Sequence, residues 1–323
     1  MVDVLSDVLR AIRLKGAVFV DVDAKAPWSA RTPSASTLLP MVMPGADHLM
    51  SFHLVTQGTV WAVTDSQTLE LGAGTIIVFP QGKSHVVCSD PALPRGQGID
   101  PFRLKSSATP PYRIKGGGAG SDRSRMVCGF FGCDAKPFNP LLAALPEVIT
   151  GDAASKDAGD LGVFYRLAAS EAHAASPGGA ATLVRLCELM LIEAIRRYLR
   201  TSIVSEGWLA GLTDPQIGRA LVAIHTDPTR SWTVETLAGE AALSRTVFAD
   251  RFNALIHRTP MAYVASWRLQ LAALRLAEGG TVAAAAAEAG YDGEASFSRA
   301  FKRSTGQSPA RWGKHRREAV ARH

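Results

Sequence analysis

The chain has 323 residues, of which 47% are hydrophobic and 20% are charged, and its formal net charge is +6. This length exceeds one ordinary core and predicts two or three domains, and the composition excludes a disordered or fibrous protein. Four cysteines are too few for a disulfide scaffold. The start has no signal-peptide core and no long apolar run follows, so we expect a cytoplasmic protein without a membrane span.

Residues 1–140 predict β structure. Short runs rich in β-branched and aromatic residues, at 49–63, 69–80 and 83–89, are separated by Gly, Pro and polar turns. Regularly spaced short strands of this kind predict a barrel or jelly roll. Small barrels hold packed side chains or a small ligand, so His53, Trp61 and His85 are candidate effector contacts, with ordinary core packing as an equal alternative.

A basic segment rich in Gly, Pro and Ser, at 94–125, interrupts the predicted strands. We interpret it as a flexible loop that joins two strands. The alternative is an arm that contacts nucleic acid or a partner subunit. A final strand follows it and contains Cys128 and Cys133. These are an odd number of positions apart, so in one regular strand they face opposite ways and cannot pair.

Helical periodicity begins after residue 140, and residues 182–200 form a strongly amphipathic helix. The width of its apolar stripe favours a subunit interface, although periodicity alone fits packing on its own barrel equally well. The segment 141–205 is therefore a helical unit, and 205–214 is a linker. The stripe contains Leu183, Leu186, Cys187, Met190, Leu191, Ala194, Ile195 and Tyr198.

Residues 214–318 contain one pattern twice. The anchors of the first copy recur in the second at a single offset: Phe248, Phe252, Pro260 and Tyr263 correspond to Phe297, Phe301, Pro309 and Trp312. In each copy a small-residue helix and a tight turn precede the aromatic helix, which is the helix-turn-helix arrangement. An intervening helix of about 18 residues, roughly 27 Å long, is expected to separate the two units.

The basic excess is concentrated in this last part of the chain. From Asp214 onward there are 15 of the 35 Lys and Arg but only 10 of the 29 Asp and Glu. A positive surface on paired helix-turn-helix units indicates nucleic-acid binding rather than a solvated face alone.

The run EAGYDGEASFSRAFKRSTGQSPARW, together with the unit before it, resembles the DNA-binding domain of the AraC/XylS transcription regulators. The resemblance implies that the second helix of each unit enters the major groove of double-stranded DNA, and that RNA polymerase is a partner. The implied DNA contacts are Arg245, Thr246, Ala249, Asp250, Glu294, Ser296, Arg299, Lys302 and Arg303. Three positions depart from the pattern. Gly293 replaces the usual N-cap, His257 stands where the second copy has Gly306, and Asp250 stands opposite Arg299.

The stretch from Gly74 to His85 resembles the second cupin motif, and residues 52–58 resemble the start of sensory cupins. Metal cupins also carry His-x-His and a Glu. The His-x-His is absent near 44–47, and Ser51 occupies the Glu position. His48 and His53 would point to opposite faces of one strand. We therefore expect no metal, no other cofactor and no catalytic residues.

These features predict an α+β multidomain protein. It comprises a cupin-like barrel (1–140), a helical dimerisation segment (141–205) and an all-α double helix-turn-helix domain (214–318). The expected function is DNA-binding transcription regulation by a homodimer that responds to a small molecule. A redox signal through Cys128 and Cys133 is the other input that the resemblance suggests, with buried structural thiols as the alternative. Two other functions remain open: a metal-dependent cupin enzyme fused to a DNA-binding module, and an effector-independent DNA-binding protein.

Overall fold

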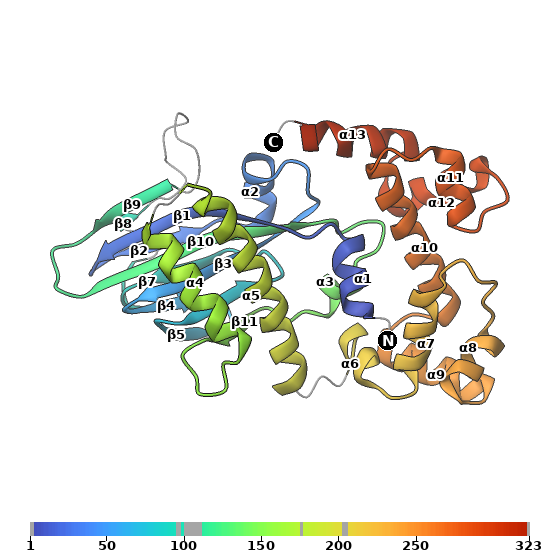
Figure 1. The fold of residues 1–323 in the computed structure, drawn as a ribbon, viewed down its shortest axis with the longest axis horizontal. Helices are drawn as coiled ribbons and strands as arrows, with labels where there is room; N and C mark the ends of the chain where they lie inside the picture. Colours follow the sequence, from blue (N-terminus) through green and yellow to red (C-terminus); the bar gives the residue numbers. More distant parts are fainter. Residues whose placement is uncertain (1–2, 95–97, 100–111, 175–176, 202–205, 322–323) are drawn as a thin grey trace.

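A computed structural model describes residues 3–94, 98–99, 112–174, 177–201 and 206–321. A β-rich half is followed by a helical half, as the sequence predicts (Figure 1). Two sheets lie face to face in the first half. The first has the strand order β11-β6-β3-β10-β1-β9, and the second has the order β5-β4-β7-β2-β8. Nearly all neighbouring strands are antiparallel; the exceptions are β1 with β9 and β2 with β8.

The strand bounds are as follows. The first sheet contains β1 (Lys15–Lys25), β3 (His48–Gln57), β6 (Thr75–Phe79), β9 (Tyr112–Gly117), β10 (Arg123–Cys133) and β11 (Ile149–Asp152). The second contains β2 (Ser29–Thr32), β4 (Thr59–Val63), β5 (Thr68–Gly72), β7 (His85–Cys88) and β8 (Gly98–Ile99).

Alternation along the strands produces two cores. In β3, Val55 belongs to the cluster between the two sheets, whereas Phe52 and Leu54 belong to the cluster on the opposite face. Successive strand side chains point to opposite faces, so the first sheet is covered on both sides. The first sheet is thus the middle layer of the domain.

The segment 94–125 is more ordered than the predicted loop. It contains β8 and β9, and β9 lies parallel to β1 at the sheet edge, with Val20 opposite Tyr112. Residues 95–97 and 100–111 of the expected loop lie outside the described residues. A parallel edge pairing needs a distant partner strand, which local composition does not reveal.

The described part of the first half contains the helices α1 (Val4–Ala11), α2 (Ala35–Val42), α3 (Pro140–Ala144), α4 (Asp160–Ala174) and α5 (Gly179–Thr201). Helices α4 and α5 pair and run across the first sheet (Figure 1). The α5 stripe faces inward, and Met190 and Leu191 are both 0% exposed within the core beneath it. The expectation that this stripe is a subunit interface is therefore wrong, because it covers the chain's own sheet.

The second half contains α6 (Trp208–Thr213), α7 (Ile217–Thr226), α8 (Val234–Ala241), α9 (Arg245–Ile256), α10 (Pro260–Ala277), α11 (Val282–Glu288), α12 (Glu294–Thr305) and α13 (Pro309–Ala321). Pairs α8–α9 and α11–α12 are the two predicted units, at opposite ends of α10 (Figure 1). Thr233 and Ser244 cap their helices through side-chain hydrogen bonds, whereas Gly293, which replaces the usual N-cap, provides none. His257 adopts the left-handed conformation, with φ 57°.

The stretch 205–214 is not a simple linker, because it contains α6. Trp208 of this helix is buried, and its indole N–H donates to the Tyr263 hydroxyl at 2.9 Å. That hydroxyl also contacts Nε2 of His225 at 2.9 Å. A polar contact to a residue far along the chain cannot be seen in local composition, so α6 was missed.

The two helix-turn-helix units attach differently to the β-rich first half of the chain, residues 3–201, which we call the sensor half. The core of the first unit, including Phe248 and Phe252, is continuous with the apolar cluster beneath α5. The second unit has a separate core around Phe297, Phe301 and Trp312. The first unit is therefore joined to the sensor half by apolar packing, whereas the second depends on other contacts. Within the described ranges, no helix is both long and apolar enough to span a bilayer.

Candidate functional site

The two predicted recognition helices expose their amino-terminal turns. Arg245, Thr246 and Asp250 of α9 and Glu294 and Arg299 of α12 are exposed; Ala249 and Ser296 are half-buried. Phe248, Phe252, Phe297 and Phe301 anchor the opposite faces in the two cores. The structure thus leaves the predicted contact residues available to the major groove.

The charged residues of the two helices have unequal partners. Arg299, Lys302 and Arg303 are exposed on α12, and no ion pair links them to the rest of the described chain. Spacings of three and four place these cations on one helix face. In α9, Arg245 pairs with Glu235 at 2.9 Å. The basic face of α12 is therefore the stronger candidate for DNA contact.

The position of Asp250 on α9 would allow an ion pair with Arg245 or Arg251, but neither pair forms. Arg245 pairs with Glu235, and Arg251 pairs with Asp214 at 2.6 Å. The Asp250 carboxylate stays exposed on the surface of α9. Among the described residues this carboxylate has no ion-pair partner.

Two of the candidate effector contacts meet in the interior of the sandwich. Nε2 of His53 lies 2.8 Å from Nε2 of His85, and Nδ1 of His53 lies 2.9 Å from Sγ of Cys128. The His85 ring also stacks on Phe79, with ring centroids 3.6 Å apart. Both histidines are buried, and burial lowers the pKa of His53 well below its ordinary value and that of His85 to about 4.

The hydrogen bonds determine which atoms of His53, His85 and Cys128 carry the protons when all three side chains are neutral. Nδ1 of His85 is 3.1 Å from the carbonyl oxygen of Lys83, which only accepts, so Nδ1 carries the proton. Nε2 of His85 then accepts from Nε2–H of His53, and Nδ1 of His53 accepts from the Cys128 thiol. The arrangement holds Cys128 as a thiol.

Trp61 does not join the two histidines. Its neighbours Val60 and Ala62 point into the cluster between the sheets, so Trp61 lies on the opposite face of β4 and is half-buried. Alternation is visible in the sequence, but the register that decides which face is interior depends on strands far along the chain.

The redox candidates are separated. Cys128 and Cys133 both belong to β10, five positions or about 16 Å apart, and both are free thiols. Burial raises the pKa of the Cys128 thiol, and that of Cys133 to about 12. Because the thiolate is the reactive form, this interior opposes thiol oxidation.

The histidines also fail to assemble a metal site. His48 is turned away from the pair, with Nε2 2.7 Å from the carbonyl oxygen of Pro80. Cys128 lies beyond the far nitrogen of His53, so only two nitrogens converge, whereas protein zinc sites provide three or four ligands. Among the described residues, no cluster of three or more His, Cys, Asp or Glu side chains is placed to hold a metal ion.

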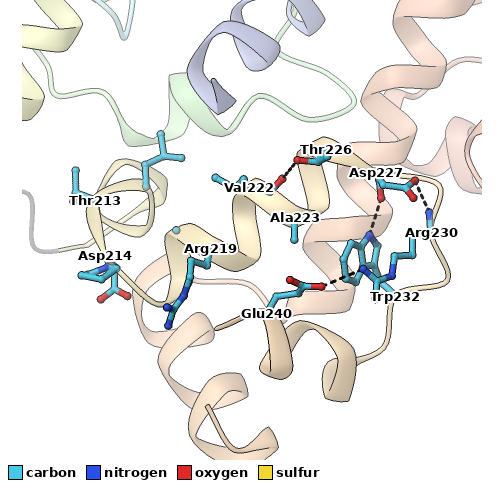
Figure 2. Close-up of a pocket in the computed structure, with 13 residues that line it drawn as sticks. Thr213, Asp214, Arg219, Val222, Ala223, Thr226, Asp227, Arg230, Trp232 and Glu240 are labelled. Atoms are coloured by element: carbon cyan, nitrogen blue, oxygen red, sulfur yellow. Dashed lines mark hydrogen bonds and ion pairs between the residues drawn. The ribbon is translucent and has the colours of Figure 1, made fainter. Parts of the chain in front are cut away.

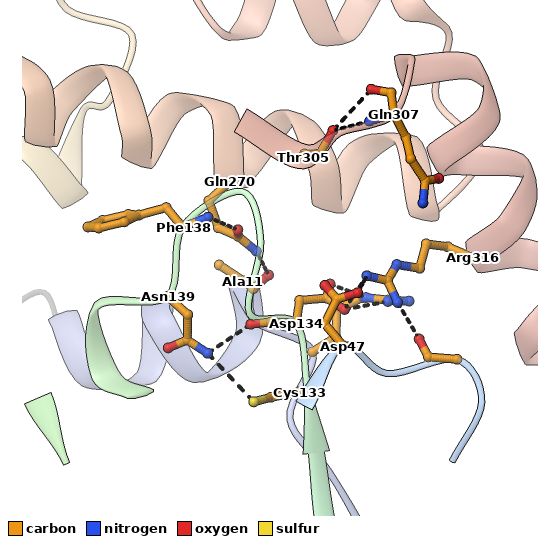
Figure 3. A network of polar contacts seen from close by, with 12 residues as sticks. Ala11, Asp47, Cys133, Asp134, Phe138, Asn139, Gln270, Thr305, Gln307 and Arg316 are labelled. Carbon is orange, nitrogen blue, oxygen red and sulfur yellow. Dashed lines mark hydrogen bonds and ion pairs between the residues drawn. The ribbon is translucent and has the colours of Figure 1, made fainter. Parts of the chain in front are cut away.

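A buried polar cluster joins α13 to the sensor half (Figure 3). Arg316 is 4% exposed, pairs with Asp47 at 2.5 Å and lies 3.4 Å from Asp134. Its Nη1 donates to the carbonyl oxygen of Gly45 at 2.6 Å. Arg13 holds both Asp134 oxygens at 2.7 Å. Two guanidinium groups thus balance two carboxylates at the domain junction.

Another buried contact at this junction involves a single amide. Gln270 of α10 is 0% exposed. Its Nε2 donates to the carbonyl oxygen of Ala11 at 2.7 Å, and its Oε1 accepts from the Phe138 N–H at 3.0 Å (Figure 3). One side chain therefore joins three distant segments. The sequence carries no signal for it, since an isolated Gln within a helix has no distinctive pattern.

An open groove of about 620 Å³ lies along α7 and α8 (Figure 2). Its polar side chains bind one another: Arg230 pairs with Glu240 at 3.1 Å and stacks over Trp232, whose indole N–H donates to the carbonyl oxygen of Asp227. Arg219 donates to the carbonyl oxygen of Ala241. These contacts stabilise the first unit, and none of them points to a ligand.

Comparisons with known proteins agree with this architecture. A cupin family model matches residues 3–200, and a helix-turn-helix domain model matches residues 237–315. A Streptomyces lividans protein described as an AraC-like transcription regulator is 32% identical, over 97% of this chain and 98% of its own length. The chain belongs to the AraC family of transcription regulators.

The chain is also similar to other named regulators. The regulator AlkR of Acinetobacter baylyi is 29% identical, over 95% of this chain and 97% of its own. The crystal structure of the DNA-binding domain of AdpA with a target DNA is 28% identical, covering 34% of this chain and all of that one, with a TM-score of 0.31. The predicted family, fold class and DNA-binding regulatory function of this AraC protein are confirmed.

The buried histidines predict acid sensitivity of this AraC regulator. In the unfolded chain they titrate near 6.5, whereas burial lowers the pKa of His85 to about 4 and that of His225 to about 3. The unfolded state then binds more protons below pH 6.5, so stability falls as pH drops. Each histidine should contribute a loss of about 2 kcal/mol between pH 6.5 and about 5.

Urea unfolding across this pH range measures the effect. His85→Gln keeps an acceptor for His53 but cannot titrate, so its free energy of unfolding should depend less steeply on pH. His315, exposed on α13, provides the control, and His315→Gln should keep the wild-type slope. An unchanged slope in His85→Gln would show that folding does not lower the pKa of His85.

Proposed function

We propose that this AraC regulator reads DNA bases mainly through α12, while α9 contributes positioning. The supporting observation is the unpaired basic face of α12, formed by Arg299, Lys302 and Arg303, against the exposed carboxylate of Asp250 on α9. Arginine near the start of a recognition helix can grip a guanine with two hydrogen bonds. An aspartate cannot do so, and phosphates repel it.

The remaining parts of the proposal follow from the AraC architecture. We propose a homodimer that acts with RNA polymerase in the cytoplasm and responds to a small molecule through its cupin domain. Exposed apolar side chains on α4 and α5 (Val163, Leu167 and Leu189) support a subunit contact outside the buried stripe. The protein is not an enzyme in this proposal, since its interior histidines bind each other rather than a reactive group.

Arg299→Ala and Asp250→Ala test whether α12 reads bases while α9 contributes positioning. Loss of a bidentate base contact should relax preference at one or two base pairs by about 1–3 kcal/mol, while weak non-specific binding remains. Asp250→Ala should tighten non-specific binding, because it removes a negative charge from the DNA face. Binding-site selection at fixed salt measures both effects.

Lys302→Ala is the matched control on the same helix face. A phosphate contact carries no base information, so this variant should weaken all sequences alike and lower the salt slope by about one. If Arg299→Ala behaves in the same way as Lys302→Ala, Arg299 is a phosphate contact and α12 does not read bases through it.

A further inference from the structure

A cavity lies outside the interior that holds the paired histidines. It has a volume of about 430 Å³, within the range of small-molecule sites. The start of β1, the connection from α2 to β3 and the end of β10 form its walls. The lining residues that matter here are Arg13, Lys15, Met43, Gly45, Gly132 and Asp134.

Backbone packing at Gly132 shapes this cavity. A Cβ atom at Gly132 would lie 2.0 Å from Sδ of Met43, so any larger residue would push the Met43 side chain aside. Glycine allows Met43 to lie against the end of β10, where it forms an apolar wall with Val42 and Ala46. The wall suits a compact apolar group.

The charges at this cavity are not balanced. The Arg13 guanidinium is occupied by Asp134, with two bonds of 2.7 Å. Lys15 is exposed at the cavity, and no residue in the described ranges forms an ion pair with it. The carboxylate of Glu188 accepts from the N–H of Gly16 at 2.6 Å and from Arg185 at 2.8 Å. One unpaired cation therefore faces an apolar wall.

We propose that this cavity binds a small organic anion, with a carboxylate paired to Lys15 and a compact apolar body against Met43. The proposal rests on the proposed function as an effector-responsive regulator and moves the effector site away from His53 and His85. A lysine ammonium at the rim stays hydrated while its partner anion keeps its apolar part in the cavity.

The position of the cavity connects it to the second DNA-reading unit. Asp134 and Gly45 line it and also contact Arg316 of α13, and Arg13 lines it and holds Asp134. An anion bound beside Arg13 changes the electrostatic balance of the same carboxylates that hold α13. Binding is thereby coupled to how firmly the second unit is attached.

Ligand-observed NMR with the full chain tests the proposal, using cyclohexanecarboxylate and its neutral isostere cyclohexanecarboxamide as probes. The carboxylate should bind about 1.5- to five-fold more tightly than the amide, the range of one exposed ion pair. Lys15→Met should remove this preference, and Met43→Trp, which fills the cavity, should abolish binding of both probes. The exposed Lys156→Met variant should behave like wild type.

Several results would overturn the proposal. They are equal binding of both probes, absence of saturable carboxylate binding in the millimolar range, or a carboxylate that still binds Met43→Trp. The measurement involves no DNA, so it is independent of base reading by Arg299. If the probes do not bind but the DNA-selection results are as expected, only the cavity site is refuted. If the probes bind as expected but the DNA-selection results are not, only the proposed base reading by α12 is refuted.

Discussion

Met190→Asp combined with Leu191→Asp is expected to unfold the protein rather than to yield a folded monomer. Both side chains are fully buried between α5 and the first sheet. Removing a large apolar side chain from a core costs about 2–5 kcal/mol, and burying a carboxyl group without a partner adds to this. Two such changes together reach the roughly 5–15 kcal/mol that stabilises a typical domain.

Near-ultraviolet circular dichroism and thermal unfolding measure this outcome, which should be loss of both the tertiary signal and a cooperative transition. Leu189→Asp is the matched control, because Leu189 lies on the same helix and is 41% exposed. That variant should stay folded. A folded double variant with altered oligomeric state would instead place the stripe in a subunit interface.

The α5 stripe illustrates what sequence alone can decide here. Periodicity shows that one helix face is apolar, but a subunit and a sheet of the same chain are equally good covers for it. The helix-turn-helix units were easier to predict because their signals are local: paired aromatics, caps such as Thr233 and a left-handed position at His257.

The sensor half was harder to predict for the opposite reason. Strand character was visible, but β9 pairs with β1 across about ninety residues, and such register is set by distant partners. His53 and His85 were identified from a motif, and the structure brings them together. The face of β4 on which Trp61 lies could not be predicted, because it also depends on pairing with distant strands. Arg316 was missed because a basic terminal helix looks like a solvated surface.

Arg316→Met is expected to loosen the second helix-turn-helix unit from the sensor half without unfolding the core of that unit. The substitution leaves the carboxylates of Asp47 and Asp134 with only Arg13 to balance them. Removing one partner of a buried ion pair costs about 3–5 kcal/mol, since an uncompensated charge remains. The separate core around Phe301 should keep its own fold.

Hydrogen exchange and urea unfolding separate local from global effects. Amides of α13 and of the connection before β3 should lose protection, and the free energy of unfolding should fall by about 3 kcal/mol or more. Adding Asp47→Asn to Arg316→Met restores charge balance and should recover part of that loss. Arg311→Met, exposed on the same helix, is the control and should change neither. A loss below about 1 kcal/mol would mean that Arg316 behaves like a surface ion pair, and the second unit would then be held mainly by Gln270 and the contact from Ser304 to Pro137.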